Sequence, residues 1–125
     1  MPRAITIPLL LTAALLTPAA ALLVYECDDP DAADLLVYER DYSPNCDLHV
    51  ELVENRGWAE EEWQWYFTDD PAEAELVIYI TTDKEIADLL IWYVEMEHQA
   101  GWEGYHPYKD HLADITALKE ARENY

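Results

Sequence analysis

The sequence is poor in basic residues, glycine and serine. Lys and Arg together number 7 against 27 Asp and Glu, which gives a formal net charge of −20. Because DNA, RNA and anionic lipid would be repelled by such a surface, we expect neither nucleic-acid nor membrane binding. There are 3 glycines, and Ser43 is the only serine, so the sequence has no glycine-rich phosphate loop and no Gly-x-Ser-x-Gly motif.

Histidine and cysteine are scarce as well. The four histidines, His49, His98, His106 and His111, do not follow a zinc-ligand spacing, and the two cysteines do not form a Cys-x-x-Cys motif. No set of residue types with complementary catalytic roles can be identified. We therefore expect a protein that is not an enzyme and that needs no metal or cofactor.

What the sequence does contain is a tandem repeat with a step of 13 residues. One step is 15 residues long, so two residues are inserted near 55–60. The longer loop created there carries Trp58 and is a candidate contact loop. The reference position of the repeat is occupied in turn by Leu22, Leu35, Leu48, Trp63, Leu76, Leu89 and Trp102.

The columns of the repeat alternate in polarity. Apolar residues stand at the reference position, two places before it and two places after it, which is the period of a β-strand. An acidic residue stands one place before the reference, and its recurrence indicates a structural role such as capping the start of a strand. The alternative is a carboxylate pair for glycoside chemistry. The acids are Asp34, Asp47, Glu62, Glu75 and Asp88.

This pattern predicts an all-β fold of about seven short strands followed by one helix. Strands of about seven residues would span roughly 23 Å, and the remaining six residues would barely return that distance, so parallel neighbours are disfavoured. We expect an antiparallel up-and-down meander or a small barrel. A narrow β-solenoid is the alternative.

A column of aromatic residues follows three places after the reference, on the face opposite the leucines. The simplest interpretation is cross-strand packing. The alternative is an exposed stripe that binds a sugar chain or a protein partner. The stripe consists of Tyr25, Tyr38, Tyr66, Tyr79, Trp92 and Tyr105.

The two ends of the chain do not follow the repeat. Residues 1–21 resemble a secretory signal peptide, with Arg3 ahead of an apolar stretch and small residues before a cleavage site. The β-repeat domain covers 22–106, and 107–125 is expected to form a helix from His111 to about Glu123, capped by Asp110 and packed on the domain. We therefore expect an exported protein, periplasmic or extracellular.

Export would place the two cysteines in an oxidising compartment. The repeat puts Cys27 near the end of one strand and Cys46 in the buried column before another. These positions lie at opposite strand ends, too far apart for a disulfide. We expect Cys46 to be a small core residue and no bridge within the chain.

The excess of acidic residues has three possible explanations: adaptation to high salt, calcium binding by the Asp-rich turns, or attraction to a basic partner. The acids are spread over all loops, and none of the loops has the Asp-x-Asp-x-Asp-Gly pattern. We therefore favour salt adaptation.

The tandem units resemble DUF6150, a family of small exported bacterial proteins of unknown function that repeats "VYVTDYxSQADLK". The similar pieces here include Val24-Tyr25 through Asp34-Leu35 and the ending Ala100-Gly101-Trp102. The resemblance covers about residues 22–105 and implies no activity or site residues. The expected function is an interaction or structural role in the cell envelope, with a protein or glycan partner. An enzyme acting on envelope glycans and a calcium-binding module are the alternatives.

Overall fold

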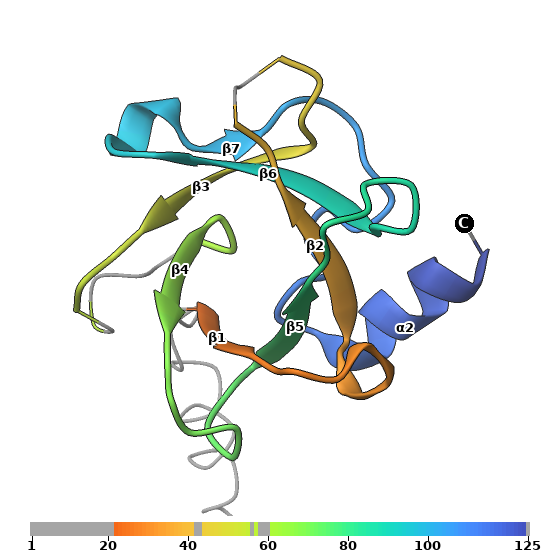
Figure 1. Ribbon diagram of the computed structural model, residues 1–125. Helices are drawn as coiled ribbons and strands as arrows, with labels where there is room; N and C mark the ends of the chain where they lie inside the picture. Colours follow the sequence, from red (N-terminus) through yellow and green to blue (C-terminus); the bar gives the residue numbers. More distant parts are fainter. Residues whose placement is uncertain (1–21, 42–43, 56, 58–60, 125) are drawn as a thin grey trace, which may run out of the picture.

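The computed structural model describes residues 22–41, 44–55, 57 and 61–124. Its core is a closed barrel of six parallel strands, in the order β4-β1-β5-β2-β6-β3, and β3 pairs with β4 to close the ring (Figure 1). The barrel strands are β1 (Leu22–Glu26), β2 (Leu35–Glu39), β3 (Leu48–Leu52), β4 (Gln64–Phe67), β5 (Leu76–Ile80) and β6 (Leu89–Val94). They are followed by β7 (Gly101–Trp102), which is antiparallel to β3, and by helix α2 (Ile115–Asn124).

The alternation of the repeat decides which side chains face inward. The leucine of each β-strand from β1 to β3 and the valine two places later are completely buried, and β5 and β6 follow the same pattern with Ile at the second position. In β4 the inward position is occupied by Trp65, whose Nε1 donates to the carbonyl of Glu62 at 2.8 Å. These side chains fill the interior of the barrel, as expected for a strand with one buried face.

The structure contradicts the predicted antiparallel meander and also the solenoid. The error lies in the strand length: most barrel strands have 5 residues and span only about 16 Å. A connection such as 27–34 reaches about 26–29 Å when extended, which is ample for a return to the same end of the barrel. Parallel neighbours are therefore possible, and they close into a ring rather than stacking as a solenoid.

The order of the strands shows that the chain goes around the barrel twice. Strands β1, β2 and β3 leave gaps, and β4, β5 and β6 fill them. The connection from β1 to β2 must cross β5, and its short 3-10 helix η1 (Pro30–Ala32) contacts that strand. Because the interior is filled with side chains, these crossings run over the outside of the barrel, and the two halves of the chain interlock.

The two-residue insertion marks the place where the second circuit begins. The connection from β3 leads to β4, which is its neighbour in the barrel, whereas the other connections between barrel strands skip one strand. Only the C-terminal half of β3, at Glu51 and Leu52, pairs with β4. Its N-terminal half, at Leu48 and His49, pairs with β7. Strand β7 thus supplies the pairing partner for the N-terminal half of β3, which β4 does not reach because it is offset along β3.

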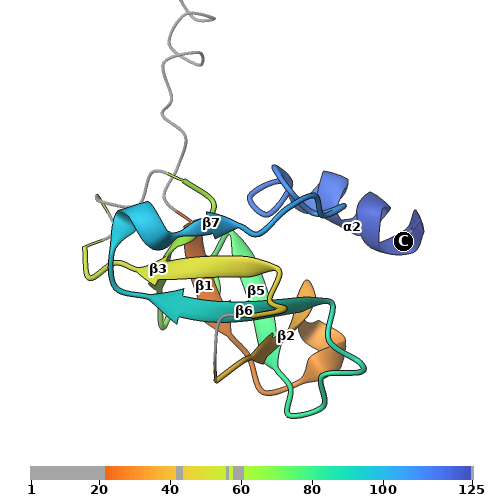
Figure 2. The same ribbon diagram turned by 90° about the horizontal axis from the view of Figure 1, so that it is seen from above.

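The segment after β7 returns to the end of the barrel where the strands begin. Leu112 and Leu118 are fully buried in the core cluster, and Tyr108 is almost so. Figures 1 and 2 show α2 outside the ring of strands. The helix begins at Ile115 rather than His111, and Asp114, not Asp110, caps it by accepting from Ala117 N at 3.2 Å.

Candidate functional site

The repeated acids bind the backbone of the barrel. The carboxylate of Asp34 accepts from Val77 N at 2.8 Å, and the N–H of Asp34 donates to the carbonyl of Val77 at 2.7 Å. The same reciprocal pair of hydrogen bonds joins Asp47 to Leu90, Glu75 to Leu23 and Asp88 to Leu36. These four carboxylates therefore attach the start of a strand to its neighbour, which is the structural role that their recurrence predicts.

The fifth acid, Glu62, has a different set of partners because it lies beside the opening between β3 and β4. Its carboxylate accepts from Trp102 Nε1 at 2.6 Å, from Asp110 N at 2.7 Å and from Leu112 N at 3.1 Å. It thus attaches β7 and the C-terminal segment to the barrel. All five carboxylates therefore accept structural hydrogen bonds, and they do not converge in one cleft.

The Asp-rich turns also use their carboxylates locally. Asp29, Asp70 and Asp83 each accept a hydrogen bond of 2.9 Å from the backbone N–H two residues later. Within the described ranges, no three His, Cys, Asp or Glu side chains converge in a way that could hold a metal ion.

The predicted aromatic stripe is a belt around the barrel. Five of its members are half-buried on the outside, where the register places Tyr25 opposite Val77, and Tyr38 opposite Leu90. In a closed barrel such a column points in all directions, so it does not form one continuous surface. Tyr105 is 90% exposed and lies beyond β7. Trp58 falls outside the described residues.

One member of the belt lines a cavity. Trp92 of β6 pairs in register with His49 of β3, and the polypeptide that follows β6 turns back over this pair. The hollow has a volume of about 650 Å³. It is lined by His49, Trp92, Tyr93, Val94, Glu95, Met96 and Gln99. We call it the Trp92 hollow.

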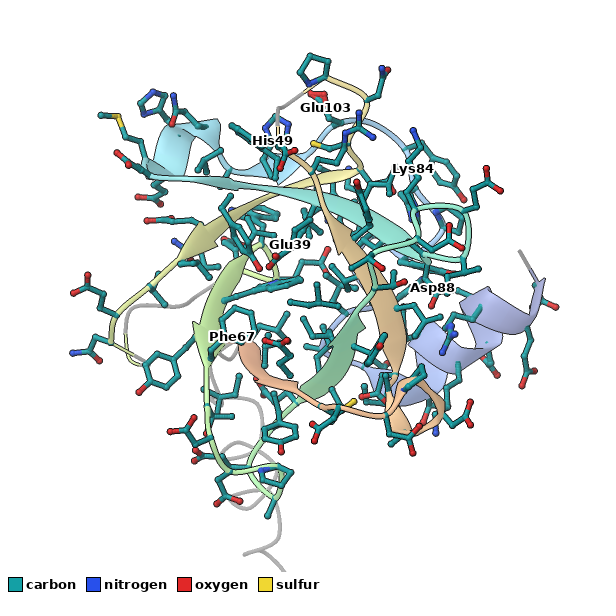
Figure 3. The ribbon with its side chains drawn as sticks, in the orientation of Figure 1. Glu39, His49, Phe67, Lys84, Asp88 and Glu103 are labelled. Atoms are coloured by element: carbon teal, nitrogen blue, oxygen red, sulfur yellow. The ribbon has the colours of Figure 1, made fainter. Side chains whose placement is uncertain are left out.

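The imidazole of His49 fixes the wall of the Trp92 hollow. Its Nδ1 lies 3.3 Å from the carbonyl of Gln99, in the short 3-10 helix η3 (Glu97–Gln99), and its Nε2 lies 3.7 Å from the Glu103 carboxylate. Figure 3 shows His49 and Glu103 together, far from Asp88 beside α2. The side chain of His49 therefore ties the connection after β6 to the barrel.

The same connection also lines a second hollow. It has a volume of about 500 Å³ and is lined by Glu61, Trp63, Glu97, His98 and Ala100. Residues of η3 thus contribute to both cavities, Gln99 to the first and Glu97 and His98 to the second. We call this cavity the Trp63 hollow.

Neither the histidine nor the connection was singled out from the sequence as part of a site. A signal was present in the repeat, since the position after the reference is aliphatic at Leu23, Leu36, Val77 and Leu90 but is His49 in β3. A second signal was Met96, which replaces the Asp or Asn that begins the turn in most other units. Met96 is 55% exposed. Both irregularities meet in the Trp92 hollow.

The two cysteines are free thiols. Cys46 is buried, as expected for a core residue, and Cys27 is half-buried at the end of β1. Burial, followed by the nearby charges of Glu103 and Asp47, raises the pKa of the Cys46 thiol to about 11. Cys46 is therefore a packing residue and not a nucleophile.

The fold and its connections define a class of protein: a small repeat domain whose strands form a closed parallel barrel with interleaved strand order. The family model described as 7(1) septoil knot domain matches residues 16–103. The chain belongs to this septoil knot domain family. The resemblance to DUF6150 is not confirmed, whereas the prediction of a small β-rich repeat domain is. No curated protein and no solved structure matches the chain.

Proposed function

We propose that the protein is a non-enzymatic binding module that acts after export, in the periplasm or outside the cell, and that its ligand binds in the Trp92 hollow. The observation that carries the proposal is the hollow itself. It presents an indole, a flexible thioether at Met96 and the polar groups of Glu95 and Gln99 in one concave surface. Apolar surface with a few polar groups is the usual composition of a ligand site.

The rest of the barrel supports this choice. The repeated acids have structural hydrogen-bond partners, and the other half-buried members of the aromatic belt lie outside the two hollows around η3. Within the described residues, no helix is both long and apolar enough to cross a membrane. A binding function needs only a rigid frame with one adaptable surface, and the closed barrel is such a frame.

Ligand-detected NMR with a library of small saccharides, aromatic amines and dipeptides tests the proposal. We expect a subset of these compounds to bind the wild-type protein and to lose binding in Trp92→Leu, because leucine keeps part of the apolar area but removes the ring. Tyr79→Leu is the matched control, since Tyr79 belongs to the same belt but lines neither hollow around η3. Loss of binding in both variants would contradict the proposal, and so would a wild-type protein that binds none of the compounds.

A further inference from the structure

The charge around the two hollows is one-sided. The Trp92 hollow contains the carboxylate of Glu95, and the Trp63 hollow contains those of Glu61 and Glu97. Among the described residues that line the two hollows, none is a Lys or Arg. An anionic ligand would meet carboxylates in both cavities, and this repulsion disfavours anions.

Each hollow also combines its carboxylates with an indole. A cation held over the face of a tryptophan is attracted by the ring, and the attraction adds to that of a neighbouring carboxylate. Guanidinium and ammonium groups can interact with the indole and with the carboxylate at once. The alkyl stems of Arg and Lys also cover apolar surface such as Met96. A neutral saccharide would use the indole but would gain little from the carboxylates.

One short segment of the chain lines both hollows. Glu95 and Glu97 are separated by a single residue, Met96, yet they face different cavities. Glu97 and Met96 are exposed, so the segment that lines both cavities is accessible to a partner. A chain carrying several cationic side chains can place one in each hollow and lie across the exposed segment that they share.

We infer that the ligand is a basic segment of another protein, whose Arg or Lys side chains occupy the Trp92 hollow and the Trp63 hollow together. This inference rests on the proposed function and specifies its partner. Whole-chain electrostatics favours the same partner, because a net charge of −20 attracts a basic protein over long distances at low salt. The two hollows then hold individual side chains after the encounter.

The test is calorimetric titration of the full domain with acetylated, amidated hexa-arginine at low and at molar salt. We expect binding to weaken about tenfold or more in Glu95→Gln/Glu97→Gln. The matched control is Glu54→Gln/Glu85→Gln, which removes the same charge from exposed positions in other connections, and we expect it to weaken binding less than about threefold. Glu61→Gln should weaken binding of hexa-arginine but not of di-arginine, because only the longer peptide reaches the second hollow.

Three outcomes would overturn the inference. Equal loss in the two double variants would show that the peptide responds to net charge and not to the hollows. Preferential binding of cellohexaose would assign the site to a neutral glycan. Small compounds that bind at Trp92 while hexa-arginine does not bind would leave the proposed function standing and remove only the basic partner.

Discussion

At the scale of single residues, the repeated acids explain how short parallel strands are held in register. The carboxylate accepts from the backbone N–H of one residue in the adjacent strand, and the backbone N–H of the acidic residue donates to the carbonyl of that same residue. A part-buried N–H that loses such a partner costs about 1–3 kcal/mol. This role accounts for the recurrence of an acid at one position of the repeat independently of the protein's overall charge.

We therefore predict that Asp34→Ala lowers the free energy of unfolding by about 1–3 kcal/mol, because Val77 N then lacks its acceptor. Equilibrium urea denaturation, with long incubation, measures the change. Asp31→Ala is the matched control, since Asp31 is exposed, and a surface change of this kind stays within about 0.5 kcal/mol. Equal effects of the two substitutions would refute the role assigned to the acids.

The two thiols should differ in reactivity. Because burial raises the pKa of Cys46 to about 11, its thiolate is scarce at pH 8, whereas Cys27 is half-buried. Titration with a chromogenic disulfide reagent is expected to label one thiol in the native protein and both after denaturation. Peptide mass spectrometry should identify Cys27 as the native site, and Cys27→Ser should be unlabelled until unfolded. Rapid labelling of Cys46 in the native state would contradict the packing described above.

At the scale of elements, β7 depends on a backbone conformation that other residues avoid. Gly101 has φ +133°, which side-chain-bearing residues rarely adopt, and it pairs with His49 in the opening between β3 and β4. We predict that Gly101→Ala destabilises the domain by about 1–3 kcal/mol in chemical denaturation. Gly104→Ala is the matched control, because a Cβ there meets nothing within 4 Å and no positive φ is present. Similar stabilities of the two variants would argue against a strained position.

The C-terminal segment should loosen in acid. His106 is buried, stacks on Trp102, and accepts from Tyr108 N through Nδ1 at 3.1 Å, which requires the neutral ring. Burial lowers its pKa below the ordinary value near 6.5, although Asp47, 3.8 Å away, opposes the shift. The unfolded chain thus takes up a proton more readily, so the stabilisation is complete above about pH 6.5 and is lost as the pH falls through the folded-state pKa.

Melting temperatures of wild type and His106→Gln between pH 7.5 and 5 measure this effect. Relative to the variant, the wild-type protein is expected to lose stability as the pH falls, by up to about 1.4 kcal/mol for each unit of pKa difference. Both proteins contain the same acidic residues, so the difference between their pH profiles isolates the contribution of His106. Parallel pH profiles would show that His106 does not contribute.

At the scale of the whole molecule, 27 acidic residues against 7 basic ones impose self-repulsion on a compact barrel. If the surface is adapted to salt, which is the explanation that the distribution of the acids favours, screening should raise the melting temperature steeply between 0.1 and 3 M NaCl. Sucrose at matched water activity, which does not screen charge, should raise it less. A rise at micromolar Ca²⁺ that Mg²⁺ does not reproduce would instead support the calcium-binding alternative.

The sequence by itself determined the number of units, the inward and outward faces of the strands and the structural nature of the acids, because these follow from local alternation and spacing. It also marked the discontinuity, since the two extra residues near 55–60 lie where the second circuit of the barrel begins. Only the tertiary structure decided that neighbouring strands are parallel and interleaved. A strand such as β1 pairs with β4 and β5, far along the chain, and no local pattern encodes that choice. The same interleaving brings His49, Trp92 and Gln99 into one wall, because pairing between distant units, not proximity in the sequence, places them side by side.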